Sequence, residues 1–167
     1  MRLQKPPHCL HLSTQHLGCG QPIKTITIVS PIKSLCSGER VTMIFDTDIL
    51  IWYLRGNPKA AAAIDESSNR AISLVTFMEL LQGAKSKSET HQIKRFLKDF
   101  GFETLPLSEK VGYRASIYVE EYALAHGIGV ADALVAATAV EENLPVLSGK
   151  TKHFKCIKDL QLKQFRA

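Results

Sequence analysis

The chain has 167 residues, a formal net charge of +5 and 45% hydrophobic residues. That length suits one domain, or one domain with an appendage, and the composition is typical of a folded globular protein rather than a chain disordered throughout. No run approaches the ~18 uncharged apolar residues of a membrane-spanning helix, so the sequence predicts no integral membrane protein. The positive charge favours a nucleic-acid partner only if it lies on the folded part.

The charge is concentrated near the start of the sequence. Residues 1–42 hold five basic side chains and one acidic one, a net charge of +4, whereas residues 43–167 carry a net charge of +1. Three of the four cysteines also lie in those first residues. Gly38-Glu39-Arg40 can be encoded by a purine-rich run that resembles a bacterial ribosome-binding site, shortly before Met43. We therefore expect residues 1–42 to be an untranslated or disordered extension, and residues 43–167 to form the folded domain.

Strands and helices are expected to alternate within residues 43–167. Pro58 suits the first turn of a helix, and the apolar residues of 88–100 recur at the i, i+3, i+4, i+7 spacing of an amphipathic helix. This alternation favours an α/β domain with a parallel sheet. In chain order, the predicted elements are a strand at 43–45, helices at 47–54 and 58–64, a strand at 71–74, helices at 76–84 and 88–100, a strand at 103–105, helices at 108–125 and 130–142, and strands at 145–148 and 160–162.

Three acidic residues are placed to meet at one edge of this sheet. Asp46 ends the first strand, Glu79 lies one turn into the helix after the second, and Asp132 opens the alanine-rich helix before the fourth. Ligands bind outside the carboxyl ends of the strands in such sheets. At ~5 Å and an effective dielectric of ~20, each carboxylate pair repels by roughly 3 kcal/mol, so the cluster needs a positive charge. Mg²⁺ or Mn²⁺ suits carboxylate ligands, although each acid taken alone can instead be a helix cap or an exposed helix residue.

Four segments together resemble one family. IFDTDILIWYLRGN, ISLVTFMELLQGA, VADALVAATAVEENLPVLS and KHFKCI are similar to PIN-domain proteins of the VapC toxin type, in the family's order and spacing. The resemblance implies a Rossmann-like three-layer α/β/α sandwich with a central parallel sheet. It also implies a Mg²⁺-dependent endoribonuclease toxin that an antitoxin protein neutralises. Asp46, Glu79 and Asp132 match the family's catalytic metal ligands, and Asp48 matches a position that supports the first ligand.

The sequence departs from this family just before KHF. Where the family usually has Thr-x-Asn-Asp, this chain has Ser148-Gly149-Lys150-Thr151, which lacks the fourth polar or acidic group. A protonated lysine cannot ligate a metal ion, and it repels a nearby cation. Lys150 can instead offset the carboxylate repulsion, contact a substrate phosphate, or point into solvent. The sequence therefore predicts no second metal ion, and a domain without cleavage activity is an alternative.

Several further residues complete the predicted site. Thr47 and Ser148 are candidates for supporting hydrogen bonds, and Lys150, Lys152 and Lys155 are candidates for RNA contacts. His153 is expected to pack rather than to act in catalysis. A single cysteine in residues 43–167 suits the cytoplasm, and the resemblance implies a homodimer.

Two other functions fit parts of the pattern. A degenerate PIN domain would bind antitoxin or RNA without cleavage, as Lys150 and Thr151 suggest. FDTDIL also resembles the Asp-x-Asp opening of haloacid-dehalogenase-like phosphatases, but the chain lacks their downstream Gly-Asp-x-x-x-Asp segment. Cleavage of RNA that depends on the three acids would separate the nuclease from both.

Overall fold

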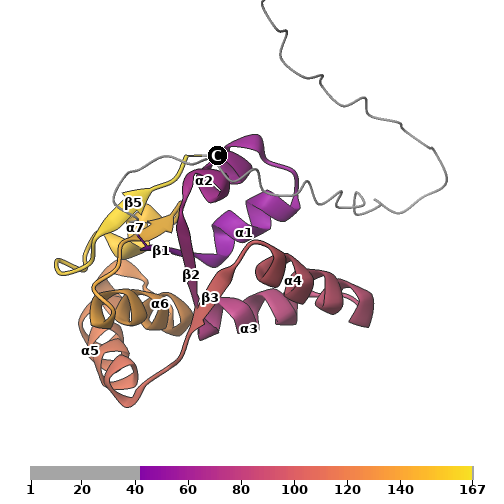
Figure 1. Cartoon of the computed structure of the whole chain (residues 1–167). Coiled ribbons are helices and arrows are strands. Elements are labelled where there is room, and N and C mark those ends of the chain that lie inside the picture. Colours follow the sequence, from indigo (N-terminus) through magenta and orange to yellow (C-terminus); the bar gives the residue numbers. More distant parts are fainter. Residues whose placement is uncertain (1–41, 167) are drawn as a thin grey trace, which may run out of the picture.

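A computed structural model describes residues 42–166, which form a five-stranded parallel sheet with helices on both faces (Figure 1). The strand order is β3-β2-β1-β4-β5. The strands are β1 (Thr42–Phe45), β2 (Asn69–Ser73), β3 (Phe102–Leu105), β4 (Val146–Ser148) and β5 (Leu162–Gln164). In the described residues, the helices are α1 (Thr47–Leu54), α2 (Pro58–Glu66), α3 (Leu74–Gly83), α4 (Lys87–Asp99), α5 (Glu109–His126), α6 (Val130–Glu141) and α7 (Thr151–Phe154).

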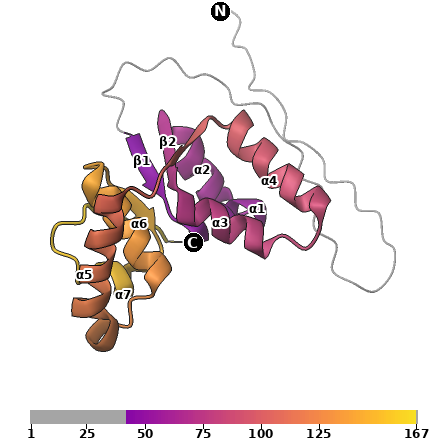
Figure 2. The ribbon, with the colours of Figure 1, turned by 90° about the horizontal axis from the view of Figure 1, so that it is seen from below.

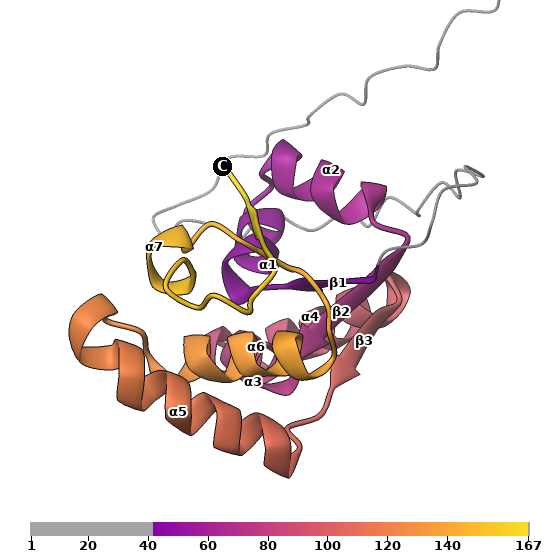
Figure 3. The ribbon, with the colours of Figure 1, turned by 90° about the vertical axis from the view of Figure 1, so that its left-hand side faces the viewer.

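Alternating side chains of the central strands bury both faces of the sheet. On β1, Phe45 packs into the core formed with α1, α2 and α4, whereas Ile44 packs into the core formed with α5 and α6. Leu147 and Val146 of β4 divide in the same way. Figure 3 shows α1 and α2 on one side of the strands and α5 and α6 on the other. The predicted three-layer α/β/α sandwich with a parallel sheet is confirmed.

Successive strands extend the sheet in opposite directions from β1, so the strand order reverses between β1 and β4. β1 pairs with β2 on one side, and β3 lies beyond β2, whereas β4 and β5 lie on the other side of β1. Figure 2 shows the helices of the two halves, with α5 beside α6 and α4 at the opposite side of the domain. Such a switch point opens a crevice at the carboxyl ends of the strands. Asp46, which follows β1, and Ser148, which ends β4, both lie there.

Local sequence explains where most helices begin. Side chains of Asp46, Asn57, Ser86 and Ser108 each accept a backbone N–H in the first turn of the helix that follows. Such capping satisfies donors that the helix itself leaves free. At the end of α5, Gly127 has a φ of 70°, a left-handed conformation that favours glycine.

Some predicted boundaries were wrong. The second strand ends at Ser73 and not at residue 74, because the Ser73 hydroxyl caps α3 by accepting the N–H of Val75. The last strand is 162–164 and not 160–162, since Leu160 is buried in the core before the strand begins. Helix α7 was not predicted at all. The predicted extension at 1–42 lies outside the described residues except for Thr42, which begins β1. Within residues 42–166, no helix is both long and apolar enough to cross a membrane.

Candidate active site

Asp46 is a fully buried carboxylate at the switch point. Its Oδ1 accepts the backbone N–H of Thr47 at 2.7 Å, and its Oδ2 accepts the Ser148 hydroxyl at 2.7 Å. Burial raises the pKa of Asp46 from 3.8 to about 6; Lys150 and the two hydrogen bonds oppose the rise, and the charge of Asp48 adds to it. The site therefore holds a carboxylate whose ionised form is costly in its surroundings.

Lys150 supplies a positive charge to this carboxylate and to a second one. Its Nζ lies 3.7 Å from Asp46 Oδ2 and donates to Asp132 Oδ1 at 2.9 Å. Burial lowers the pKa of Lys150, but the charges of Asp46, Asp132 and Glu79 outweigh burial, so the pKa is raised overall. Of the alternatives open for this lysine, the structure places it against the carboxylates rather than in solvent.

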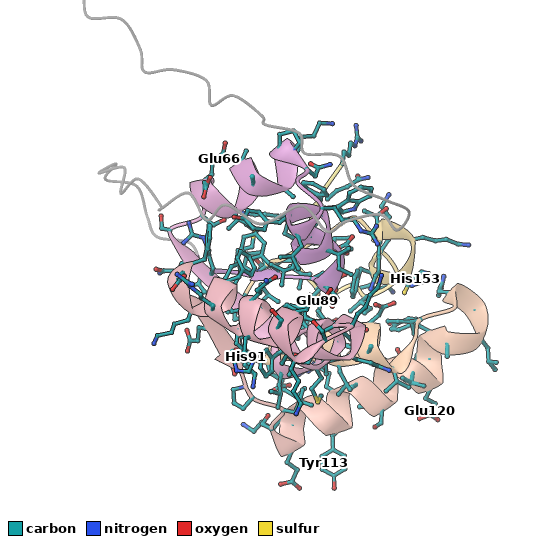
Figure 4. All side chains as sticks on the ribbon, turned by 90° about the vertical axis from the view of Figure 1, so that its right-hand side faces the viewer. Glu66, Glu89, His91, Tyr113, Glu120 and His153 are labelled. Atoms are coloured by element: carbon teal, nitrogen blue, oxygen red, sulfur yellow. The ribbon has the colours of Figure 1, made fainter. Side chains whose placement is uncertain are left out.

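Asp132 is held from a second direction by His153. It lies near the start of α6, and its Oδ2 accepts a hydrogen bond from His153 Nδ1 at 2.9 Å. His153 lies on α7 (Figure 4). The expectation that His153 packs rather than acts in catalysis stays a prediction, but the structure gives His153 a hydrogen bond to Asp132 as well. Asp132 lies 21 residues before His153 on a different helix, so no local signal in the sequence indicated this contact.

Glu79 joins the cluster through a threonine. It lies on α3 and accepts a hydrogen bond from the hydroxyl of Thr47, which begins α1. The backbone N–H of the same threonine bonds to Asp46, so Thr47 links two of the three predicted acids. Thr47 thus makes hydrogen bonds to two of the acids, while its supporting role in the site stays a prediction.

Asp48 lies in the first turn of α1, is half-buried and lines a cavity. Its Oδ2 accepts the backbone N–H of Gly149 at 2.8 Å, and its Oδ1 is buried without a hydrogen-bond partner. A Cβ at position 149 would lie 2.8 Å from Asp48 Oδ2, so only glycine fits there without movement. The cavity has a volume of about 370 Å³ and is lined by Thr47, Asp48, Ile51, Glu79, Gln82, Gly83 and Lys150.

The side chains as they are arranged do not fit a divalent cation. The oxygens of Asp46 and Asp132 are already engaged by Ser148, Lys150 and His153. In residues 42–166, no three His, Cys, Asp or Glu side chains are grouped so that they could hold one metal ion. The ammonium of Lys150 lies where the cluster needs its positive charge, and the Mg²⁺ or Mn²⁺ site stays a prediction.

The three lysines predicted to contact RNA differ in how exposed they are. Lys152 and Lys155 are exposed, in α7 and just after it, whereas Lys150 is half-buried against the acids. Thr151 begins α7 and is half-buried. The RNA contacts of these lysines stay a prediction.

Comparison with known proteins identifies the family. Residues 43–157 match the family model described as PIN domain. Ribonuclease VapC10 of Mycobacterium tuberculosis is 30% identical over 123 residues, covering 71% of this chain and 90% of the relative. Ribonuclease VapC of Rickettsia bellii is 32% identical over 125 residues, covering 72% and 93%. Ribonuclease VapC1 of Methanocaldococcus jannaschii is 28% identical over 137 residues, covering 81% and 96%.

Solved structures agree with this result. A toxin–antitoxin complex from Klebsiella pneumoniae superposes with a TM-score of 0.61 at 28% identity, over 71% of this chain and 94% of that one. VapBC2 from Rickettsia felis, bound to a DNA fragment from its promoter, shares the fold with a TM-score of 0.63 at 23% identity, over 75% and 100%. The family match sets aside the phosphatase alternative. With most of its length matched by the family model, the chain belongs to the PIN-domain family, and its relatives are ribonucleases of the VapC type.

Proposed function

We propose that this chain is the ribonuclease toxin of a toxin–antitoxin pair and that it hydrolyses RNA phosphodiester bonds. The observation that carries the proposal is the meeting of Asp46, Glu79 and Asp132 around Lys150 at the carboxyl edge of the sheet. The ribonuclease relatives and the toxin–antitoxin structure from Klebsiella pneumoniae support it. The antitoxin partner, the homodimer and the cytoplasmic location belong to the same proposal.

Hydrolysis of a phosphodiester needs an oriented water and a positive charge near the phosphoryl oxygens. Glu79 and Lys150 line the same cavity, so a carboxylate and an ammonium face one space. Glu79 is assigned to orient the attacking water, and Lys150 to attract the phosphoryl oxygens. Asp46 and Asp132 hold Lys150 in place, while Lys152 and Lys155 bind the flanking phosphates.

The test is cleavage of a labelled RNA by the full chain. Glu79→Gln and Asp132→Asn should lose cleavage, and so should Asp46→Asn, since each removes a charge from the cluster. Circular dichroism should show that the three variants remain folded. Asp65→Asn, at an exposed position of α2, serves as the matched control and should cleave like the wild type. Cleavage that persists in all three variants would contradict the proposal, because it would come from a contaminating nuclease or from another site.

A second candidate function follows from the same lysine. Lys150 already pairs with Asp46 and Asp132, so the cluster is neutralised without any added ion. This arrangement also suits a degenerate PIN domain that binds antitoxin or RNA without cleaving RNA. In that case the wild type would bind RNA without cutting it. Lys150→Asn would then gain cleavage in the presence of Mg²⁺, which identifies the lysine as the defect.

A further inference from the structure

Lys150 is built into the site by its backbone as well as by its ammonium. Its backbone N–H donates to the Ser148 hydroxyl at 3.0 Å, and that hydroxyl in turn donates to Asp46. At the other end of the side chain, Nζ reaches Asp132 at 2.9 Å and Asp46 at 3.7 Å. The lysine is thus held at its backbone through Ser148 and at its ammonium by the two carboxylates that it neutralises, unlike a surface lysine.

We propose that Lys150 is the resident cation of this cluster and that it competes with a divalent metal ion for Asp46 and Asp132. A metal ion held by these two residues would use the same oxygens that the ammonium now contacts. Mg²⁺ binds carboxylate oxygens at about 2.1 Å and carries two positive charges, so it cannot share them with an adjacent ammonium. Occupancy by the metal and occupancy by Lys150 therefore exclude each other.

The two competitors are not equal, because the lysine is part of the chain. A tethered group is present at a high effective concentration, whereas a metal ion must come from solution and lose some of its water. The lysine side chain can also leave without unfolding, since it lines the cavity beside Glu79. The wild type should therefore bind divalent metal weakly and stay folded without it.

This inference deepens the proposed function and rests on it only where the metal ion is used in cleavage. Its test measures metal binding and needs no RNA. Mn²⁺ binding to the metal-free full chain would be titrated by electron paramagnetic resonance and by calorimetry. Lys150→Met removes the charge and keeps the length, Lys150→Arg keeps the charge, and Lys94→Met changes an exposed lysine of α4 as the matched control.

Lys150→Met should bind Mn²⁺ at least about tenfold more tightly than the wild type, because the competing charge is gone. Lys150→Arg and Lys94→Met should remain as weak as the wild type. In chelator, the melting temperature of Lys150→Met should lie below that of the wild type, since Asp46 and Asp132 then lack a counter-charge. Mn²⁺ should raise that temperature in Lys150→Met and leave the wild type unchanged.

Equal Mn²⁺ affinity in the wild type and Lys150→Met would overturn the inference. Equal melting temperatures of these two proteins in chelator would overturn it as well. If Lys150→Met does not fold in chelator, recovery of the fold on adding Mn²⁺ supports the inference, and failure to recover contradicts it. Lys150→Asn serves as the second variant for this measurement. A gain in metal affinity without cleavage by any variant would refute the proposed ribonuclease and leave the competition intact.

Discussion

Replacing Asp46 by Asn should stabilise the folded chain at neutral pH. The carboxylate is fully buried, and burial raises its pKa to about 6 even though Lys150, Ser148 and Thr47 oppose the rise. An ionised group that is held in unfavourable surroundings costs stability. Asn has nearly the same shape and can still accept the Thr47 N–H, but it carries no charge to desolvate.

The magnitude follows from the two pKa values. The unfolded chain loses the Asp46 proton near pH 3.8 and the folded chain near pH 6. Between these values the folded state binds more protons than the unfolded state, so the free energy of unfolding falls as the pH rises through this window. Since one pKa unit corresponds to 1.36 kcal/mol, the loss amounts to about 3 kcal/mol by neutral pH. Asp46→Asn should avoid this loss.

Urea denaturation of the full chain in chelator, from about pH 4 to about pH 7, measures the effect. The stability difference between Asp46→Asn and the wild type should grow across this range and level off above pH 6. Asp65→Asn, which changes an exposed carboxylate on α2, should follow the wild type throughout. A variant that is no more stable than the wild type at neutral pH, or a difference that does not depend on pH, would refute the reasoning.

Three further substitutions test other contacts. Gly149→Ala should lower the free energy of unfolding in urea by about 1–3 kcal/mol, because its Cβ would clash with Asp48 Oδ2. Removing that carboxylate in the double variant with Asp48→Ala should recover part of the loss. Ser148→Ala should cost about 1–3 kcal/mol and lower RNA cleavage, since Asp46 Oδ2 loses its hydroxyl donor; unchanged cleavage would contradict the role of that bond. Phe96→Ala should cost about 3–5 kcal/mol in thermal or urea unfolding, because the ring is buried among aromatic neighbours; a cost near zero would show that this core is not packed as described.

Much of the fold could be predicted because local patterns agree with the tertiary structure. The strands of a parallel sheet are buried on both faces, so they read as short apolar runs between helices, as at 43–45 and 145–148. Asp46 could be placed because the cap of the next helix directly follows the end of a buried strand. These signals lie within a few residues of one another in the sequence.

The contacts of Lys150 and His153 could not be predicted in the same way. Both depend on α7, a single turn of four residues whose apolar pattern is too short to indicate a helix. Their partner Asp132 lies 18 and 21 residues earlier, on a different element. The sequence therefore indicated that Lys150 was unusual for the family, but only the folded arrangement shows which carboxylates it neutralises.

The bond between Ser148 and Asp46 joins residues that are 102 positions apart. Asp46 directly follows the first strand of the domain, whereas Ser148, Lys150 and His153 come from its last part. During synthesis, the acids therefore lack the side chains that bond to Asp46 and Asp132 until residue 153 has been added. A prematurely terminated product that ends before β4 would contain all three predicted acids and still lack the groups that position two of them. The site as described is therefore completed only when the last part of the domain has been made.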